Sequence, residues 1–146
     1  MTSDADAIEA LKYRYVRGLD TKDWDTFADC MTPDVTADYN GLTFDNRDAL
    51  VDYMRTSLPG IATMHQMHHP EIDVDGDDAT GRWYLHDKVL APAFDYYLEG
   101  AGFYADRYVR TGDGWKIAHT GYVRTWELTG KLSALGTVKA PDPVES

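Results

Sequence analysis

The first sixty residues carry hydrophobic positions at helical spacing. A first apolar face repeats at steps of three and four residues: Ile8, Leu11, Tyr15 and Leu19. Ser3 suits the N-cap of this helix, whereas Gly18 and Asp20 interrupt its apolar face. The pattern therefore predicts a helix that ends near Gly18. It leaves the Asp20 carboxylate at the buried end of the helix, where a charge needs a partner.

Two further helices and one strand are predicted before residue 61. Asp23 suits the cap of a second helix, and Pro33 is expected to end that helix. A strand is expected at 35–39. Asn46 suits the cap of a third helix, which the Pro-Gly pair at 59–60 is expected to end.

The rest of the chain has the alternation typical of strands. Strands are expected at 61–75, 79–90, 102–110 and 115–128. Three helices followed by an antiparallel meander predict an α+β fold in which the helices cover one face of the sheet. We expect a single domain over 1–146, with its core at 7–128 and an irregular tail at 129–146.

Composition narrows the possible partners. The 146 residues carry a net charge of -11, which argues against a nucleic-acid backbone or an anionic membrane as partner. The single cysteine, Cys30, excludes an intrachain disulfide framework and fits a reducing compartment. Neither an apolar stretch of membrane-spanning length nor a leader pattern is evident, so a cytoplasmic location is expected.

Two charged residues stand out in the predicted sheet. In the strand at 82–90, Asp87 falls on the apolar face together with Trp83 and Leu85. A carboxylate that faces a core marks either a functional site or a buried structural ion pair. Arg124 is similar, because alternation places it on one face with three apolar or aromatic residues: Ala118, Tyr122 and Trp126. A salt bridge at the rim is the alternative for Arg124.

The histidines gather at 63–69, where His65, His68 and His69 lie within five positions. A zinc site is disfavoured, because His65 and His68 point to opposite faces of a strand and no nearby thiol or carboxylate completes a ligand set. A general base is the more plausible function, although a hydrogen-bonded core histidine remains possible. The acidic run at 73–78 lacks the spacing of a calcium loop and predicts a hairpin turn.

These features together resemble the SnoaL-like branch of the nuclear-transport-factor-2-like proteins. Within that branch the chain is most similar to bacterial bile-acid 7-alpha-dehydratases and more distantly to scytalone dehydratase and hexachlorocyclohexane dehydrochlorinase. The similarity covers residues 7–127. It lies in these strings: Tyr15 to Asp20 with Trp24, Met64-His65 with His68 and Pro70-Glu71-Ile72, Ala79 to Leu85 with Asp87, Phe103-Tyr104, and Thr120 to Arg124.

The resemblance implies a cone-shaped barrel, in which a strongly curved, mostly antiparallel sheet is wrapped by three N-terminal helices around a deep apolar pocket. By the same resemblance, Asp20 and His65 form a catalytic pair and Tyr15 donates a hydrogen bond to a substrate carbonyl. Asp87 and Arg124 are expected to complete the polar end of the pocket. Three aromatic residues are expected to contact the substrate: Tyr39, Trp83 and Tyr122.

The implied activity is that of a cofactor-independent dehydratase, a hydro-lyase that removes water from a hydroxylated cyclic or steroidal ketone by general acid-base catalysis. No metal and no organic cofactor are expected. The segment at 91–100 is expected to form a loop at the pocket mouth that differs from the bile-acid enzymes, so the steroid is less well supported than the reaction class. A ketosteroid-type isomerase and a non-catalytic ligand-binding module remain alternatives. A homo-oligomer, a dimer or trimer, is expected to form through an outer sheet face that includes Tyr104 and Tyr108.

Overall fold

A computed structural model describes residues 2–139 of the chain. Three α-helices and six strands follow in the order α1 (Asp4–Thr21), α2 (Trp24–Asp29), β1 (Met31–Tyr39), β2 (Leu42–Phe44), α3 (Arg47–Ser57), β3 (Ala62–Asp75), β4 (Asp78–Ala91), β5 (Tyr96–Thr111) and β6 (Gly114–Gly130). Two short 3-10 helices lie at Pro92–Phe94 and Leu132–Ala134. None of the helices in this described part has the length and apolarity needed to cross a membrane.

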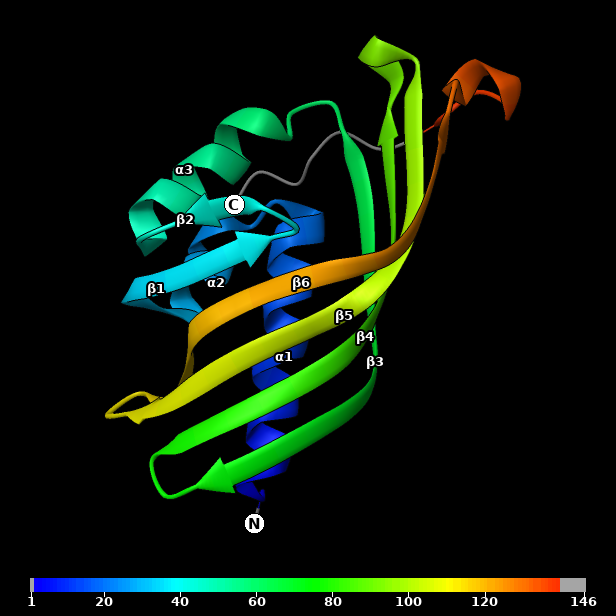
Figure 1. The fold of residues 1–146 in the computed structure, drawn as a ribbon. Coiled ribbons are helices and arrows are strands. Elements are labelled where there is room, and N and C mark those ends of the chain that lie inside the picture. Colours follow the sequence, from blue (N-terminus) through cyan, green and yellow to red (C-terminus); the bar gives the residue numbers. More distant parts are fainter. Residues whose placement is uncertain (1, 140–146) are drawn as a thin grey trace.

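The six strands form one open, strongly curved sheet in the order β2-β1-β6-β5-β4-β3. All neighbouring strands are antiparallel except β1 and β6, which are parallel. Figure 1 shows α1 crossing behind the sheet, where it lies against β3 and β6, with α2 and α3 beside β1. The α+β prediction is confirmed, because the helices gather on one side of a mostly antiparallel sheet.

The first helix is longer than its sequence pattern predicted. The Ser3 side chain caps it as expected, but the helix continues through Gly18 to Thr21, and Lys22 ends it in the left-handed conformation with φ 58°. Gly18 does not end the helix. It allows the close approach of α2, because a Cβ atom at this position would lie 2.9 Å from the Phe27 backbone nitrogen. Asp20 therefore lies in the last turn of α1.

Pro33 does not end the second helix, as had been expected. That helix ends at Asp29, and Pro33 lies within β1. The register between β1 and β6 shifts between Met31 and Thr36, so the residue without an N–H group lies where the ladder is irregular. The Asn46 cap of α3 is confirmed, since its side chain accepts a hydrogen bond from the Ala49 backbone N–H at 2.8 Å.

The expected loop at 91–100 is mostly strand. Only the single turn Pro92–Phe94 interrupts the hairpin, and β5 starts at Tyr96, where it pairs with Ala91. At the other edge of β5, Tyr97 pairs with Gly130, which extends β6 into the predicted tail. The prediction missed these ends because both segments depend on pairing with distant strands rather than on local alternation.

On β5 and β6, some residues lie on a different face of the sheet from the one predicted. Asp87 lies on the buried face of β4 as predicted, but a register shift in β6 pairs Trp126 with Ala101, so Trp126 leaves the face of Arg124.

Tyr104 and Tyr108 were expected on an outer interface. They are only 1% and 0% exposed, and both belong to the hydrophobic core. The homo-oligomer remains a prediction without these residues as its interface.

The hydrophobic core fills the space between the helices and the inner face of the sheet. Helices and strands both contribute fully buried side chains to it, among them Ile8, Leu11, Phe27, Leu50, Leu85 and Ile117. Burial of each such side chain stabilises the fold by roughly 1.5–3 kcal/mol. The core anchors the end of α1 against the sheet, and this fixes the position of the site.

Candidate active site

A cavity of about 190 Å³ lies between the end of α1, α3 and the inner face of the sheet. The apolar residues that line it are Leu19, Leu42, Met54, Leu58, Ile61 and Val89. The lining residues with polar groups are Tyr15, Tyr39, Thr63, His65, Asp87, Tyr104, Tyr122 and Arg124. An apolar cavity with a few converging polar groups is the usual form of a small-molecule site.

Asp20 and His65 form a close pair at one wall of the cavity. The Asp20 Oδ1 atom lies 2.6 Å from His65 Nδ1, and the two side chains are 21% and 12% exposed. With neutral imidazole, this contact places the proton on Nδ1 and leaves a lone pair on Nε2. Within the described residues Nε2 has no hydrogen-bond partner, so it is available to a ligand in the cavity.

The backbone of β3 fixes the Asp20 carboxylate in this position. The His65 N–H donates to Asp20 Oδ2 at 2.8 Å, and the Thr63 hydroxyl donates to Oδ1 at 2.9 Å. Thr63 and His65 lie on the same face of β3 because they are two residues apart. Three donors thus hold one carboxylate, and the carboxylate in turn orients the imidazole.

Asp87 on β4 and Arg124 on β6 form a second pair, which spans the intervening strand β5. Asp87 lies directly opposite His65 in the ladder between β3 and β4. Its two oxygens accept hydrogen bonds from both terminal nitrogens of Arg124, each at 2.7 Å, and these bonds raise the pKa of the guanidinium. Arg124 Nε also lies 2.9 Å from Glu127 Oε1. The guanidinium is therefore matched by two carboxylates.

Gly100 makes room for this second pair. It lies opposite Asp87 on β5, and a Cβ atom there would come 2.0 Å from Arg124 Nη1 and 3.2 Å from Asp87 Oδ1. No side chain other than hydrogen fits beneath the guanidinium without displacing it. The sequence offered no signal for this glycine, because its need arises only when three strands pair.

Four tyrosines close the deep end of the cavity. The hydroxyls of Tyr15 and Tyr39 are hydrogen-bonded to each other at 2.5 Å, Tyr39 stacks on Tyr122, and Tyr104 packs against Tyr122. Burial raises the pKa of Tyr15, Tyr39 and Tyr104 well above the ordinary tyrosine value and raises that of Tyr122 as well. These phenols stay protonated and serve as hydrogen-bond donors rather than as bases.

The structure brings most of the predicted site residues to this cavity. Six of them line it: Tyr15, Tyr39, His65, Asp87, Tyr122 and Arg124. Asp20 lies behind His65 and meets the cavity through the imidazole. Trp83 does not line the cavity. It is buried in the core, where its Nε1 donates to the Tyr108 hydroxyl at 3.0 Å.

Sequence reasoning missed several residues of the site. Tyr104 was assigned to the outer face, and Thr63, Gly100 and Glu127 were given no function. The period of two from Tyr104 to Gly102 and Gly100 could have placed these residues on one face. No local signal in the sequence marks the hydrogen bond from Thr63 to the Asp20 carboxylate, because its partner lies on a distant element. The ion pair between Glu127 and Arg124 has no local signal either, because the whole sheet sets the orientation of Arg124.

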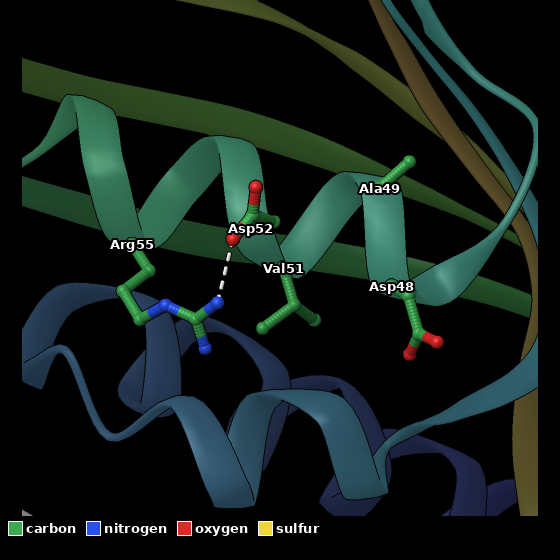
Figure 2. Close-up of a pocket in the computed structure, with 5 residues that line it drawn as sticks. All are labelled: Asp48, Ala49, Val51, Asp52 and Arg55. Carbon is green, nitrogen blue, oxygen red and sulfur yellow. Dashed lines mark hydrogen bonds and ion pairs between the residues drawn. The ribbon is translucent and has the colours of Figure 1, made fainter.

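A second hollow lies on the surface along α3. Figure 2 shows its five lining residues, all from this helix: Asp48, Ala49, Val51, Asp52 and Arg55. Its volume is about 430 Å³, but its one ion pair, between Asp52 and Arg55, is more than half exposed. Such a groove lacks the buried polar groups of the first cavity. Within residues 2–139, no three His, Cys, Asp or Glu side chains are grouped to hold a metal ion.

The sequence model of the SnoaL-like domain matches residues 1–121. The chain belongs to the SnoaL-like domain family. Its three helices and its curved, open six-stranded sheet form the nuclear-transport-factor-2-like cone.

Three solved structures show the range of this fold. A protein of unknown function from Mycobacterium tuberculosis is 29% identical, with a TM-score of 0.72, over 81% of this chain and 69% of that chain. The beta subunit of benzoate 1,2-dioxygenase from Burkholderia mallei is 26% identical, with a TM-score of 0.70, over 86% and 92%. A scytalone-dehydratase-like protein from Novosphingobium aromaticivorans is 21% identical, with a TM-score of 0.75, over 96% and 92%. A protein described as a scytalone dehydratase thus shares the fold of this chain.

Proposed function

We propose that this SnoaL-like protein is a cofactor-independent dehydratase that acts on a hydroxylated cyclic ketone. The observation that carries the proposal is the Asp20–His65 pair, because His65 lines the cavity and its Nε2 atom has no hydrogen-bond partner among the described residues. A carboxylate that orients an imidazole in this manner makes it an effective general base. The protonated tyrosines of the same cavity supply hydrogen-bond donors for a carbonyl oxygen.

The residues account for each atom in the reaction. His65 Nε2 takes a proton from carbon activated by the carbonyl, and the electron pair of that C–H bond becomes the new C=C bond. The C–O bond to the hydroxyl breaks with its electron pair. The protonated imidazole then returns the proton to the departing oxygen, which leaves as water. Asp20 stabilises the imidazolium between these two steps.

The hydroxyl pair of Tyr15 and Tyr39 suits the carbonyl oxygen of the substrate. Each phenol has one proton, and the bond between the two hydroxyls uses only one of the two protons. The remaining proton can be donated to the oxygen on which negative charge develops. A preorganised donor of this kind typically contributes about 2.7–4 kcal/mol to transition-state stabilisation.

The cavity favours a small, uncharged substrate over a steroid. Its volume of about 190 Å³ is below the roughly 300–1,000 Å³ typical of drug-sized ligands. Among the lining residues in the described part of the chain, Arg124 is the only permanent cation, and Asp87 and Glu127 already match its charge. We therefore propose a neutral hydroxy-ketone of one or two rings.

Two other functions fit parts of this geometry. An isomerase would use the same proton abstraction without losing a hydroxyl, and the mass of the product separates it from a dehydratase. A subunit role is favoured by the similarity to the beta subunit of benzoate 1,2-dioxygenase. That alternative predicts no turnover by the isolated chain and a requirement for a partner protein.

Mass spectrometry of a substrate panel tests the proposal. Purified protein is incubated with small cyclic hydroxy-ketones and hydroxylated 3-oxo-4-ene steroids, alongside the variants His65→Ala and His68→Ala. His68 is the matched control, because it lies on the same strand with an exposed side chain. Loss of water from a ring compound by wild type and His68→Ala, but not by His65→Ala, is expected. Equal turnover by His65→Ala would contradict the proposal.

A further inference from the structure

A fully buried lysine lies beneath the deep end of the cavity. Lys12 is 0% exposed and lies on α1, one turn before Tyr15. Its ammonium Nζ lies 4.4 Å from the centre of the Tyr15 ring and 3.7 Å from the centre of the Tyr104 ring. Both rings line the cavity. The ammonium is thus in contact with the faces of two tyrosines that line the ligand space.

A network of buried groups holds this ammonium in place. Its Nζ lies 2.8 Å from Asp106 Oδ2 and 3.3 Å from the Thr120 hydroxyl. The same Asp106 oxygen accepts a hydrogen bond from the Tyr108 hydroxyl, which in turn accepts one from Trp83. Burial lowers the pKa of the Lys12 ammonium, and the adjacent Asp106 carboxylate opposes that shift.

A purely structural origin explains this pair incompletely. Replacing a buried ion pair with apolar residues of similar volume is often neutral or stabilising, so stability alone gives little reason to keep a lysine here. Asp106 Oδ1 has no hydrogen-bond partner among the described residues, so the network is not saturated either. The stability of the fold does not require that the Lys12 ammonium lie against two rings that line the cavity.

We propose that Lys12 is a positioning residue that acts through Tyr15 and Tyr104 and makes the deep end of the cavity selective for an anionic oxygen. A cation against the face of a phenol ring withdraws electron density from it and strengthens its O–H as a donor. The effect is greatest when the acceptor is an enolate or phenolate oxygen rather than a neutral carbonyl. This inference rests on the proposed function, because the dehydration passes through charge on that oxygen.

Binding of 2-naphthol tests this inference without knowledge of the substrate. Naphthol and naphtholate differ in their absorption spectra, so the ionised fraction of the bound probe can be measured across a pH series. Naphthalene, which cannot ionise, reports whether the cavity itself is intact. The double variant Lys12→Met with Asp106→Asn removes both charges, and it avoids the unpaired buried carboxylate that would endanger folding of the single variant.

Wild-type protein is expected to bind the probe with an enhanced naphtholate-to-naphthol ratio. The double variant is expected to lower that ratio about 3- to 30-fold, the range of a desolvated cation–π contact, while naphthalene affinity stays unchanged. An unchanged ratio in the double variant, with Tyr15→Phe lowering it, would overturn the role of Lys12 and leave the proposed function standing. A wild-type ratio no higher than that of Tyr15→Phe would overturn both.

Discussion

The two pairs of polar side chains beside the cavity differ in what they can do. Asp20 holds an imidazole, a group that can act as a base or as an acid, and leaves its Nε2 free. Asp87 holds a guanidinium, which stays charged and has its terminal nitrogens occupied. The two pairs meet where His65 on β3 lies opposite Asp87 on β4. Under the proposed function, the first pair moves protons, whereas the second fixes the shape of the cavity and its electrostatic field.

Removing the charge of the first pair gives the largest expected effect. Asp20→Asn keeps the size of the side chain but cannot stabilise an imidazolium, so kcat is expected to fall about 10³- to 10⁴-fold, or roughly 4–5 kcal/mol in barrier height. Steady-state rates on an accepted substrate measure this. Asp23→Asn, which changes a carboxylate that only caps α2, is the matched control. A loss below tenfold would remove the distinction between the two pairs.

Stability at alkaline pH tests the burial of the tyrosines that line the cavity together with the two pairs. Because burial raises the pKa of Tyr15, Tyr39 and Tyr104, these groups bind protons more tightly in the folded than in the unfolded chain. Their contribution to stability is complete below pH 10 and is lost as pH rises, at about 4 kcal/mol per pH unit for three groups.

Absorbance at 295 nm and denaturant unfolding between pH 8 and 12 test this expectation. The exposed tyrosines are expected to ionise first, and the buried ones only together with unfolding. Ionisation of all ten tyrosines near pH 10 in folded protein would contradict the burial of the cluster.

Gly100→Ala tests the second pair through its supporting surface. The added Cβ atom would lie 2.0 Å from Arg124 Nη1, so the guanidinium must move, at an expected loss of about 1–3 kcal/mol in the free energy of unfolding. Gly112→Ala is the control, because no atom lies within 4 Å of a Cβ there. Urea unfolding measures the free energy of unfolding of both variants. Equal stability of Gly100→Ala and Gly112→Ala would show that the guanidinium does not need the space that Gly100 leaves.

Thr63→Val gives the smallest effect and sharpens the account of the first pair. It removes one of the three hydrogen bonds to Asp20 while keeping the shape of the side chain. We expect turnover to fall about fivefold, as for a hydrogen bond worth roughly 1 kcal/mol, and Thr63→Ser to restore it. If Thr63→Ser is as slow as Thr63→Val, the hydroxyl is not what orients the carboxylate.

The outline of the fold could be predicted because its signals are local. Helical spacing and caps at Ser3 and Asn46 gave the helices, and alternation placed Asp87 on the buried face of its strand. The errors arose where distant strands decide. Pro33 lies in a strand at a register shift, and the strand from Tyr96 exists because it pairs with both neighbours.

The site shows the same division between local and distant signals. Tyr15 and His65 were assigned through resemblance, and the fold brings them to one cavity across elements far apart in the chain. A register shift in β6 moved Trp126 off the face of Arg124, and alternation cannot reveal such a shift. Lys12 has no local signal in the sequence, because its buried partner Asp106 lies on β5.

Hydrogen exchange on a simple ketone tests the central claim most directly, because it follows proton abstraction alone. 2-Tetralone is a two-ring ketone, and NMR in D₂O records deuterium entering beside its carbonyl. The account predicts faster exchange with wild-type protein and with His68→Ala, near-background exchange with His65→Ala, and slow exchange with Asp20→Asn. Exchange that is equally fast with wild type and His65→Ala, or absent from both, would contradict the claim that His65 is a general base oriented by Asp20.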